Sequence, residues 1–149
     1  MNGDSFNDLL NNKNRFANEQ TTYFYVYSLN QYPNYLKIGI TSDLYMRTRK
    51  GYGKRLKVLF FQRRHEAYAL EQAMLNATKT NHYYPSDYIN WPGVTEIRRM
   101  SQENLFDILE EMLNTLTDKG LYQFMLKHCL LYAHQRKKIE KLISDQQAA

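Results

Sequence analysis

The segment YFYVY at residues 23–27 constrains the fold of this chain more than any other stretch of its sequence. Aromatic and β-branched residues favour extended backbone, because their side chains pack well on a pleated sheet. A second segment of this kind, KIGIT at residues 37–41, follows a polar stretch that contains Pro33 and has the composition of a turn. Together they predict an antiparallel hairpin with strands at about 22–29 and 35–41.

Further elements complete the predicted core. A helix at about 43–50 follows the hairpin, and another at about 65–79 has its apolar residues at the spacing of one buried stripe. Between them, LKVLFFQ at 56–62 predicts a third strand, apolar enough to be the central, buried strand of the sheet. Residues 80–95 contain proline and glycine and predict a loop, with a short edge strand at 94–98.

The last third of the chain predicts helices. Ser101 caps a strongly amphipathic helix, and a last helix at about 121–144 is apolar in its first half and basic in its second. The order β-β-α-β-α predicts an α+β fold, with a small three-stranded antiparallel sheet flanked by helices and a C-terminal helical hairpin. The predicted regions are a flexible polar arm at 1–20, a core domain at 21–100 and the hairpin at 101–149.

Positive charge is concentrated in one block of the sequence. The formal net charge of the 149 residues is +5, but the segment between Leu44 and His65 holds no acidic residue. Its basic residues are Arg47, Arg49, Lys50, Lys54, Arg55, Lys57, Arg63 and Arg64. Such a block indicates a polyanionic partner, most often nucleic acid, and the plainer alternative is a solvated face. The thirteen tyrosines, several of them beside this block, add groups that can stack and hydrogen-bond.

Composition excludes several classes of protein. The single cysteine, Cys129, cannot form an intramolecular disulfide or a cysteine-based zinc cluster. No apolar run approaches the ~18 residues that a membrane span needs, and the first residues do not resemble a signal peptide. These features predict a cytoplasmic protein.

Four short motifs occur in a specific order. They are Tyr23-Phe24-Tyr25, then Lys37-Ile38-Gly39, then Arg47 eight residues beyond the glycine, and Glu71 on the following predicted helix. Their order and spacing, over roughly 22–96, resemble the GIY-YIG nuclease family, and in particular its phage- and plasmid-associated branch with Lys-Ile-Gly. The resemblance implies that 21–100 is a nuclease domain and that the cytoplasm in question is that of a bacterial, phage or plasmid context.

The resemblance also implies a role for each motif residue. Tyr25 would activate water or relay its proton, Arg47 would clamp the scissile phosphate, and Glu71 would bind one Mg²⁺ or Mn²⁺ ion. Asn90 is taken as the family's final asparagine. Lys37 stands where the family usually has a second tyrosine; it can lower the pKa of the phenol or hold a phosphate.

The residues themselves leave alternatives open. Arg49 competes for the role of phosphate clamp, and Glu66 for that of metal ligand. Asn76 and Asn81 are alternatives for the final asparagine. Glu96 either braces the arginine clamp or lines the cleft.

The predicted function is a metal-dependent endonuclease that hydrolyses DNA phosphodiester bonds by in-line attack of water. The predicted nucleic-acid contacts are Arg49, Lys50, Lys54, Arg55, Arg63 and Arg64. Whether the DNA is single- or double-stranded stays open, and a homodimer would provide the two active sites that a double-strand cut needs.

The alternative, suggested by Lys37, is a nucleic-acid-binding module that has lost catalysis. A third hypothesis is a small domain that binds another polyanion. The basic end from Arg136 to Lys141 either grips DNA or simply completes the fold.

Overall fold

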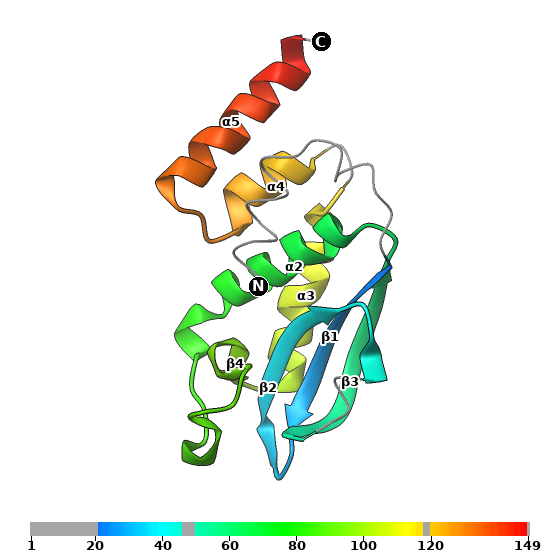
Figure 1. Ribbon diagram of the computed structural model, residues 1–149, viewed down its shortest axis with the longest axis vertical. Coiled ribbons are helices and arrows are strands. Elements are labelled where there is room, and N and C mark those ends of the chain that lie inside the picture. The colour runs from blue at the N-terminus through cyan, green and yellow to red at the C-terminus, as the bar shows by residue number, and fades with distance from the viewer. Residues whose placement is uncertain (1–20, 46–49, 118–119, 149) are drawn as a thin grey trace.

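The computed structural model describes residues 21–45, 50–117 and 120–148. In these ranges the chain is an α+β protein with one four-stranded antiparallel sheet, in the order β3-β1-β2-β4 (Figure 1). The strands are β1 (Thr22–Leu29), β2 (Tyr32–Thr41), β3 (Tyr52–Phe61) and β4 (Ile97–Arg99). The predicted class is therefore right, and the sheet has one strand more than the three that were predicted for it.

The central strand is β1 and not the predicted strand at 56–62. β1 pairs with β2 on one side and with β3 on the other, so β3 lies at an edge of the sheet. The apolar run in β3 serves both faces: Leu59 packs against the helices, whereas Phe60 meets Tyr23 on the opposite face and is 62 % exposed. The unbroken apolar run therefore belongs to an edge strand that has apolar side chains on both of its faces, and not to a buried central strand.

The β1–β2 hairpin turns through Asn30 and Gln31, and β2 begins earlier than predicted, at Tyr32. Pro33 falls where the β1–β2 register is irregular. A proline has no N–H to donate, so it is tolerated at such an irregularity without loss of a ladder hydrogen bond. The short edge strand predicted at 94–98 is found as β4, which begins later than predicted, at Ile97, and pairs with β2.

The α-helices are α2 (Arg64–Ala77), α3 (Gln102–Thr115), α4 (Leu121–His128) and α5 (Ala133–Ala148). Short 3₁₀ turns, η3 (Lys79–Asn81), η4 (Ser86–Tyr88) and η5 (Val94–Glu96), shape the segment between α2 and β4. Ser101 caps α3 as predicted, because its side chain accepts a hydrogen bond from the Asn104 N–H. Half of the helix predicted at 43–50, residues 46–49, lies outside the described part of the chain.

The last helix, predicted as one piece, is two. The backbone is extended at Cys129, whose thiol donates to the Ala69 carbonyl of α2, and α5 starts anew after Tyr132. The Gln135 side chain accepts a hydrogen bond from the Tyr132 N–H, which is one half of a capping box. The predicted two-helix hairpin is therefore wrong: α4 packs on α2, and α5 packs on α4 and extends toward the C-terminus (Figure 1).

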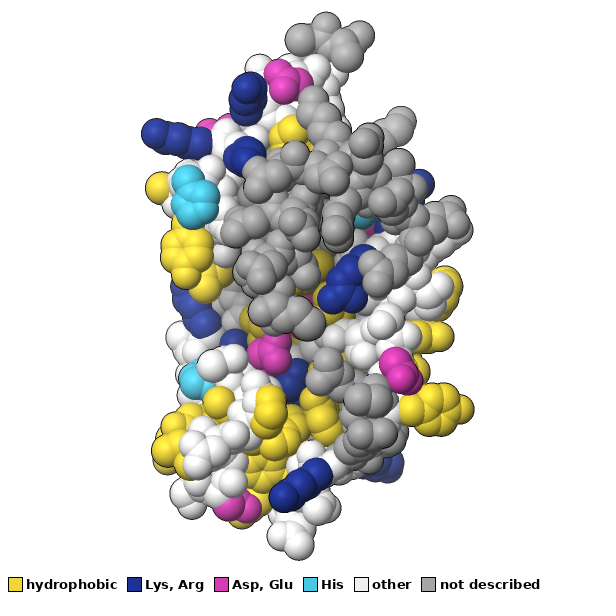
Figure 2. Space-filling view, in the orientation of Figure 1, with side chains coloured by type: hydrophobic (Ala, Val, Ile, Leu, Met, Phe, Trp, Pro, Cys, Tyr) yellow, Lys and Arg dark blue, Asp and Glu magenta, His cyan; other side chains and the backbone are white. Residues whose placement is uncertain are grey.

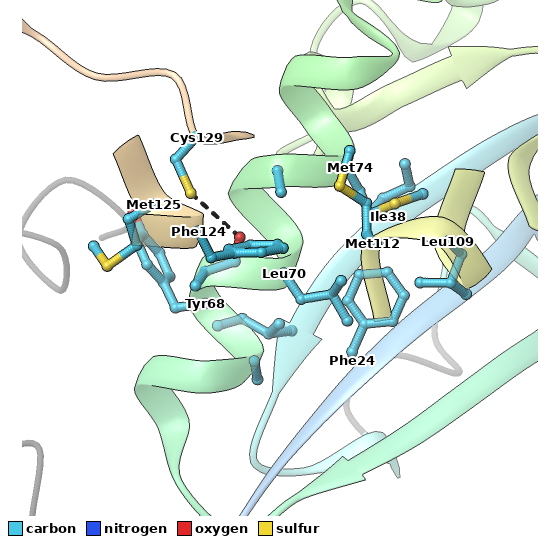
Figure 3. Close-up of a cluster of buried hydrophobic side chains, with 14 of the residues drawn as sticks. Phe24, Ile38, Tyr68, Leu70, Met74, Leu109, Met112, Phe124, Met125 and Cys129 are labelled. Carbon is cyan, nitrogen blue, oxygen red and sulfur yellow. Dashed lines mark hydrogen bonds between the residues drawn. The ribbon is translucent and has the colours of Figure 1, made fainter. Parts of the chain in front are cut away.

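The two faces of the sheet bury different sets of residues. Alternate side chains of β1 and β2, such as Phe24 and Ile38, join α2, α3 and α4 in the main hydrophobic core (Figure 3). On the other face, a smaller aromatic core gathers around Leu29, Tyr88 and Ile97. The segment between α2 and β4 packs against it, so the polar residues of this face lie beside that segment.

No helix in the described ranges has both the length and the apolar character needed to cross a membrane.

Candidate active site

The candidate site lies on the face of the sheet that carries the smaller core. Lys37 of β2 projects there, 2 % exposed, and its ammonium donates to the Tyr25 hydroxyl at 3.0 Å. The same nitrogen forms an ion pair with Glu96 Oε1 at 2.9 Å and donates to the Ile38 carbonyl at 2.8 Å. The three donors of the ammonium thus have three acceptors, from β1, β2 and η5.

Gly39 makes the contact between Tyr25 and Lys37 sterically possible. It lies opposite Tyr25 in the β1–β2 ladder, and a Cβ at this position would fall on the Tyr25 hydroxyl. The same Cβ would come within 2.7 Å of Lys37 Nζ. The glycine of the Lys-Ile-Gly motif therefore leaves the space in which phenol and amine meet.

Glu71 brings a buried carboxyl group from α2. Its side chain is 1 % exposed, and Gln72 Nε2 donates to its Oε1 at 3.3 Å. Burial, and next the nearby charge of Glu96, raise the pKa of Glu71 to about 7, while Lys37 acts in the opposite direction. The interaction of Glu71 with Glu96 and Lys37 shows that the three charged groups form one electrostatic cluster.

This donor set fits a divalent cation. A carboxylate that is desolvated and faces a second carboxylate gains most from a bound positive charge, and Mg²⁺ commonly binds one or two carboxylates and keeps several waters. Glu71 would be the ligand, with Glu96 beside it. Within the described ranges, three or more His, Cys, Asp or Glu side chains do not gather at any one place, so the arrangement does not suggest a zinc site.

Aromatic rings line the site on the side of β3. The Tyr52 hydroxyl lies 3.3 Å from that of Tyr25, and the rings of Tyr25, Tyr27 and Tyr52 meet edge to face. Trp91 continues this wall, with its ring centroid 4.9 Å from that of Tyr52 and its Nε1 donating to the Lys50 carbonyl at 3.2 Å. The segment between α2 and β4 is thereby attached to the chain that leads into β3.

Sequence reasoning did not identify two parts of this arrangement. It named Glu96 only as a brace for Arg47 or a lining residue, and the structure pairs it with Lys37. It also did not identify Tyr52 and Trp91. The sequence signal available was the glycine at position 51; in the structure its φ is +96°, and a Cβ there would strike the Trp91 indole, so the close contact with this large side chain requires glycine.

The structure does not bring every predicted site residue together. Asn90 is exposed on the turn that follows η4, and within the described ranges no hydrogen bond joins it to Tyr25, Lys37 or Glu71. Arg47 lies outside the described residues. Tyr25, Lys37 and Glu71 are thus the predicted residues that the structure brings to one place.

The predicted nucleic-acid contacts that the structure describes lie on different elements. Arg49 lies outside the described residues. On β3, Arg55 Nε donates to the Tyr27 hydroxyl at 3.0 Å on the face of the candidate site, whereas the exposed Lys54 has its N–H bonded to Ser28 Oγ. Arg63 is exposed just before α2, and Arg64, the first residue of α2, lies close enough to lower the pKa of Glu71.

The C-terminal basic residues form a separate group. Arg136, Lys137, Lys138 and Lys141 are exposed on α5, and Arg136 donates to the Leu126 carbonyl of α4. Dark-blue side chains at the upper end of the molecule in Figure 2 mark basic residues in this part of the surface. Their predicted role as DNA contacts stays a prediction.

Comparison of the chain with protein-family models, with curated proteins and with solved structures found no match. Its function must therefore be inferred from the residues of the site.

Proposed function

We propose that this protein is a metal-dependent endonuclease that hydrolyses DNA phosphodiester bonds with Tyr25, Lys37 and Glu71 at its active site. The observation that carries the proposal is the contact of the Lys37 ammonium with the Tyr25 hydroxyl, 3.0 Å away, in a site that also holds the buried Glu71. Burying a phenol, an amine and a carboxyl group from three different elements costs free energy of desolvation. Such a cluster is typical of a site that acts on a polar substrate.

Each residue has a step that its chemistry allows. A free phenol has a pKa of ~10 and is a weak base at neutral pH, but an adjacent ammonium favours the phenolate, which can take a proton from the attacking water. Glu96 holds the Lys37 ammonium against the phenol through their 2.9 Å ion pair. Arg47 is proposed to clamp the phosphate with its planar guanidinium.

Glu71 is proposed to hold Mg²⁺ or Mn²⁺, with the remaining positions left to water and substrate oxygens. When bound, the ion supplies positive charge to the phosphate and the leaving oxygen. A homodimer would supply the second active site that a double-strand cut needs.

A specific observation favours a second candidate, a DNA-binding module without catalysis. Tyr25 is only 1 % exposed, and all three donors of Lys37 are already engaged inside the protein. Such a network is also what a structural polar cluster would show.

Cleavage assays separate the two candidates. The protein is incubated with supercoiled plasmid, single-stranded DNA and RNA in Mg²⁺, Mn²⁺ or EDTA. The nuclease proposal expects DNA cleavage that requires the metal and falls by about 10²–10⁴-fold in Tyr25→Phe, since this is the usual contribution of a general base. Glu71→Gln, which keeps the shape of the side chain, should abolish the metal-dependent cleavage.

Matched controls come from the same elements. Tyr23→Phe removes a hydroxyl on the same strand and the same face as Tyr25, and Glu66→Gln removes a carboxylate from the first turn of α2. Both variants should cleave like the unmodified protein. DNA that is bound but uncut under every metal condition would reject the nuclease and support the binding module.

A further inference from the structure

Two neighbouring arginines of β4 have opposite environments. Arg98 is 5 % exposed, and its guanidinium donates to Thr78 Oγ1, Thr95 O, Ile97 O and Leu75 O. These contacts join the end of α2 to β4, so Arg98 is part of the scaffold. Arg99 points to the other face of the strand and is exposed.

Two aromatic rings hold the Arg99 side chain. Its guanidinium carbon lies 5.5 Å from the ring centroid of Tyr83 and 6.0 Å from that of Tyr35. The two rings are stacked, with an interplanar angle of 28° and centroids 6.5 Å apart, and Tyr83 is itself 56 % exposed. Cation–π contacts of this kind orient the planar fork without using its N–H donors.

Those donors remain available. Within residues 21–45, 50–117 and 120–148, no hydrogen bond or ion pair engages the guanidinium of Arg99. An exposed, oriented guanidinium with open donors matches two oxygens of a phosphate group. Arg99 therefore has the features of an anion contact, and Arg98 has those of an internal staple.

The register of the sheet places Arg99 close to the candidate active site. Tyr35 lies opposite Arg99, and Lys37 lies opposite Ile97, so both pairs are on the same face of the sheet and two residues apart. Two residues of a strand span about 7 Å. This is about two 3.4 Å steps along one strand of a nucleic acid.

Large hydrophobic side chains are exposed on the segment before β4, where Tyr83 is 56 % and Ile89 is 60 % exposed. Figure 2 shows hydrophobic side chains gathered over the lower part of the molecule, with Lys and Arg side chains among them. Figure 1 places the end of the β1–β2 hairpin and the segment before β4 in this part. Protein surfaces that bind nucleic-acid strands commonly combine positive charge with aromatic rings.

We propose that Arg99, held by Tyr35 and Tyr83, binds a DNA phosphate one or two nucleotides from the phosphate that is cut. The position relative to the cut rests on the proposed nuclease function; the phosphate contact itself does not. The ligand is a phosphodiester of the DNA backbone, and the contact positions the strand without selecting its sequence.

The salt dependence of binding tests this contact. Affinity for a labelled 20-base-pair duplex, and for one of its strands alone, is measured by fluorescence anisotropy in EDTA over a range of salt concentrations. Arg99→Ala should weaken binding about tenfold, and the slope of log affinity against log salt should become shallower by about 0.9 on the duplex or 0.7 on the single strand, the value of one lost phosphate contact.

Two further variants separate charge from orientation. Arg99→Lys should restore the slope and only part of the affinity, because lysine keeps the charge and loses the planar fork. Tyr83→Ala should keep the slope and lose about threefold in affinity, because the guanidinium loses one supporting ring. Lys127→Ala, which removes an exposed charge from α4 on the helical side of the sheet, is the matched control.

The outcomes distinguish this inference from the proposed function. If Arg99→Ala has the affinity and slope of Lys127→Ala on both DNA forms, the phosphate contact is rejected, whatever the cleavage assay shows. If Arg99→Ala loses one phosphate contact but the unmodified protein never cuts, the contact stands and the nuclease proposal is rejected. Thermal unfolding of each variant checks that the exposed substitutions leave the fold intact.

Discussion

Lys37 connects three parts of the chain that are far apart in the sequence. Its ammonium contacts the Tyr25 hydroxyl of β1, the Glu96 carboxylate of η5 and, through charge alone, Glu71 of α2. Because the ammonium is buried in a medium of low dielectric constant, its charge interacts more strongly with its neighbours than it would at the surface. The residue that departs from the expected motif is thus at the centre of the polar cluster.

Removing the Lys37 charge should lower the free energy of unfolding, and removing the charge of its partner Glu96 at the same time should lower it less. Lys37→Met removes the ammonium that is ion-paired with the Glu96 carboxylate and that offsets the nearby charge of Glu71, so we expect a loss of about 3 kcal/mol in the free energy of unfolding. The double variant Lys37→Met/Glu96→Gln should recover at least about 1 kcal/mol of this loss.

Urea unfolding measures this cycle. Lys54→Met, at an exposed lysine of β3, is the control and should change stability by no more than about 0.5 kcal/mol. Equal stability of the Lys37 and Lys54 variants would mean that the buried ion pair contributes nothing.

Glu71 should make stability depend on pH in a defined window. Its pKa is raised from 4.5 to about 7 in the folded state, so between these values the folded chain holds a proton that the unfolded chain has lost. The contribution of Glu71 is present below pH 4.5 and is lost as pH rises through about 7. Glu71→Gln, which cannot ionise, should flatten this decline, whereas Glu66→Gln should keep it.

The proposed metal should stabilise the protein more at high pH than at low pH. Mg²⁺ competes with the proton for the Glu71 carboxylate, so the added ion should raise the unfolding midpoint more at pH 8 than at pH 6. A midpoint shift that is independent of pH, or that survives in Glu71→Gln, would place the ion elsewhere.

At the scale of elements, the β1–β2 hairpin positions the site and contains a strained residue. Gln31 is exposed in the turn and has a φ of 69°, a conformation that costs residues with a Cβ about 1–2 kcal/mol. Glycine adopts it freely but loses more conformational entropy on folding.

Gln31→Gly should therefore stabilise the protein by about 0.5–1 kcal/mol, the strain relieved minus the added entropy cost. For a chain of this size this is a rise of a few degrees in the thermal midpoint. Gln31→Ala, which keeps the Cβ, should give no such gain. A lower midpoint for the glycine variant would show that the turn is not strained.

At the scale of the whole molecule, the main core joins α4 to α2 and the sheet. Cys129 at the end of α4 is 5 % exposed, and its thiol donates to the Ala69 carbonyl of α2 at 3.4 Å (Figure 3). Burial raises the pKa of this thiol to about 12, so the reactive thiolate is scarce in the folded state.

Labelling of Cys129 should then report the opening of α4 from α2. The unmodified protein should react with iodoacetamide far more slowly than a free cysteine does. Phe124→Ala, which removes a buried ring from the same helix, should speed labelling by about 10²- to 10⁴-fold, because such truncations cost about 3–5 kcal/mol. Tyr132→Ala, at a position that is 73 % exposed, should not. Fast labelling of the unmodified protein would contradict the close packing of α4.

Much of the fold could be predicted because its signals are local. The aromatic run predicted the bounds of β1, the apolar stripe predicted α2, and Ser101 predicted the start of α3. The order of the strands could not be predicted from apolar content, because β3 is apolar on both faces although it lies at an edge. The break between α4 and α5 depends on the contact of Cys129 with α2, which no helical period reveals.

The candidate site, too, was predicted from the sequence only in part. The sequence predicted the two strands that carry Tyr25 and Lys37, and their register in the structure, with Gly39 opposite Tyr25, places both side chains on one face of the hairpin. That Glu96 is the residue paired with Lys37, and that Glu71 is buried beside both, was decided by the packing of α2 and of the segment before β4 on the sheet. By itself the sequence determined which residues alternate and where chains turn, since these follow from nearest-neighbour sterics; only the tertiary structure decided which charges meet, because ion pairs between distant segments depend on how whole elements pack.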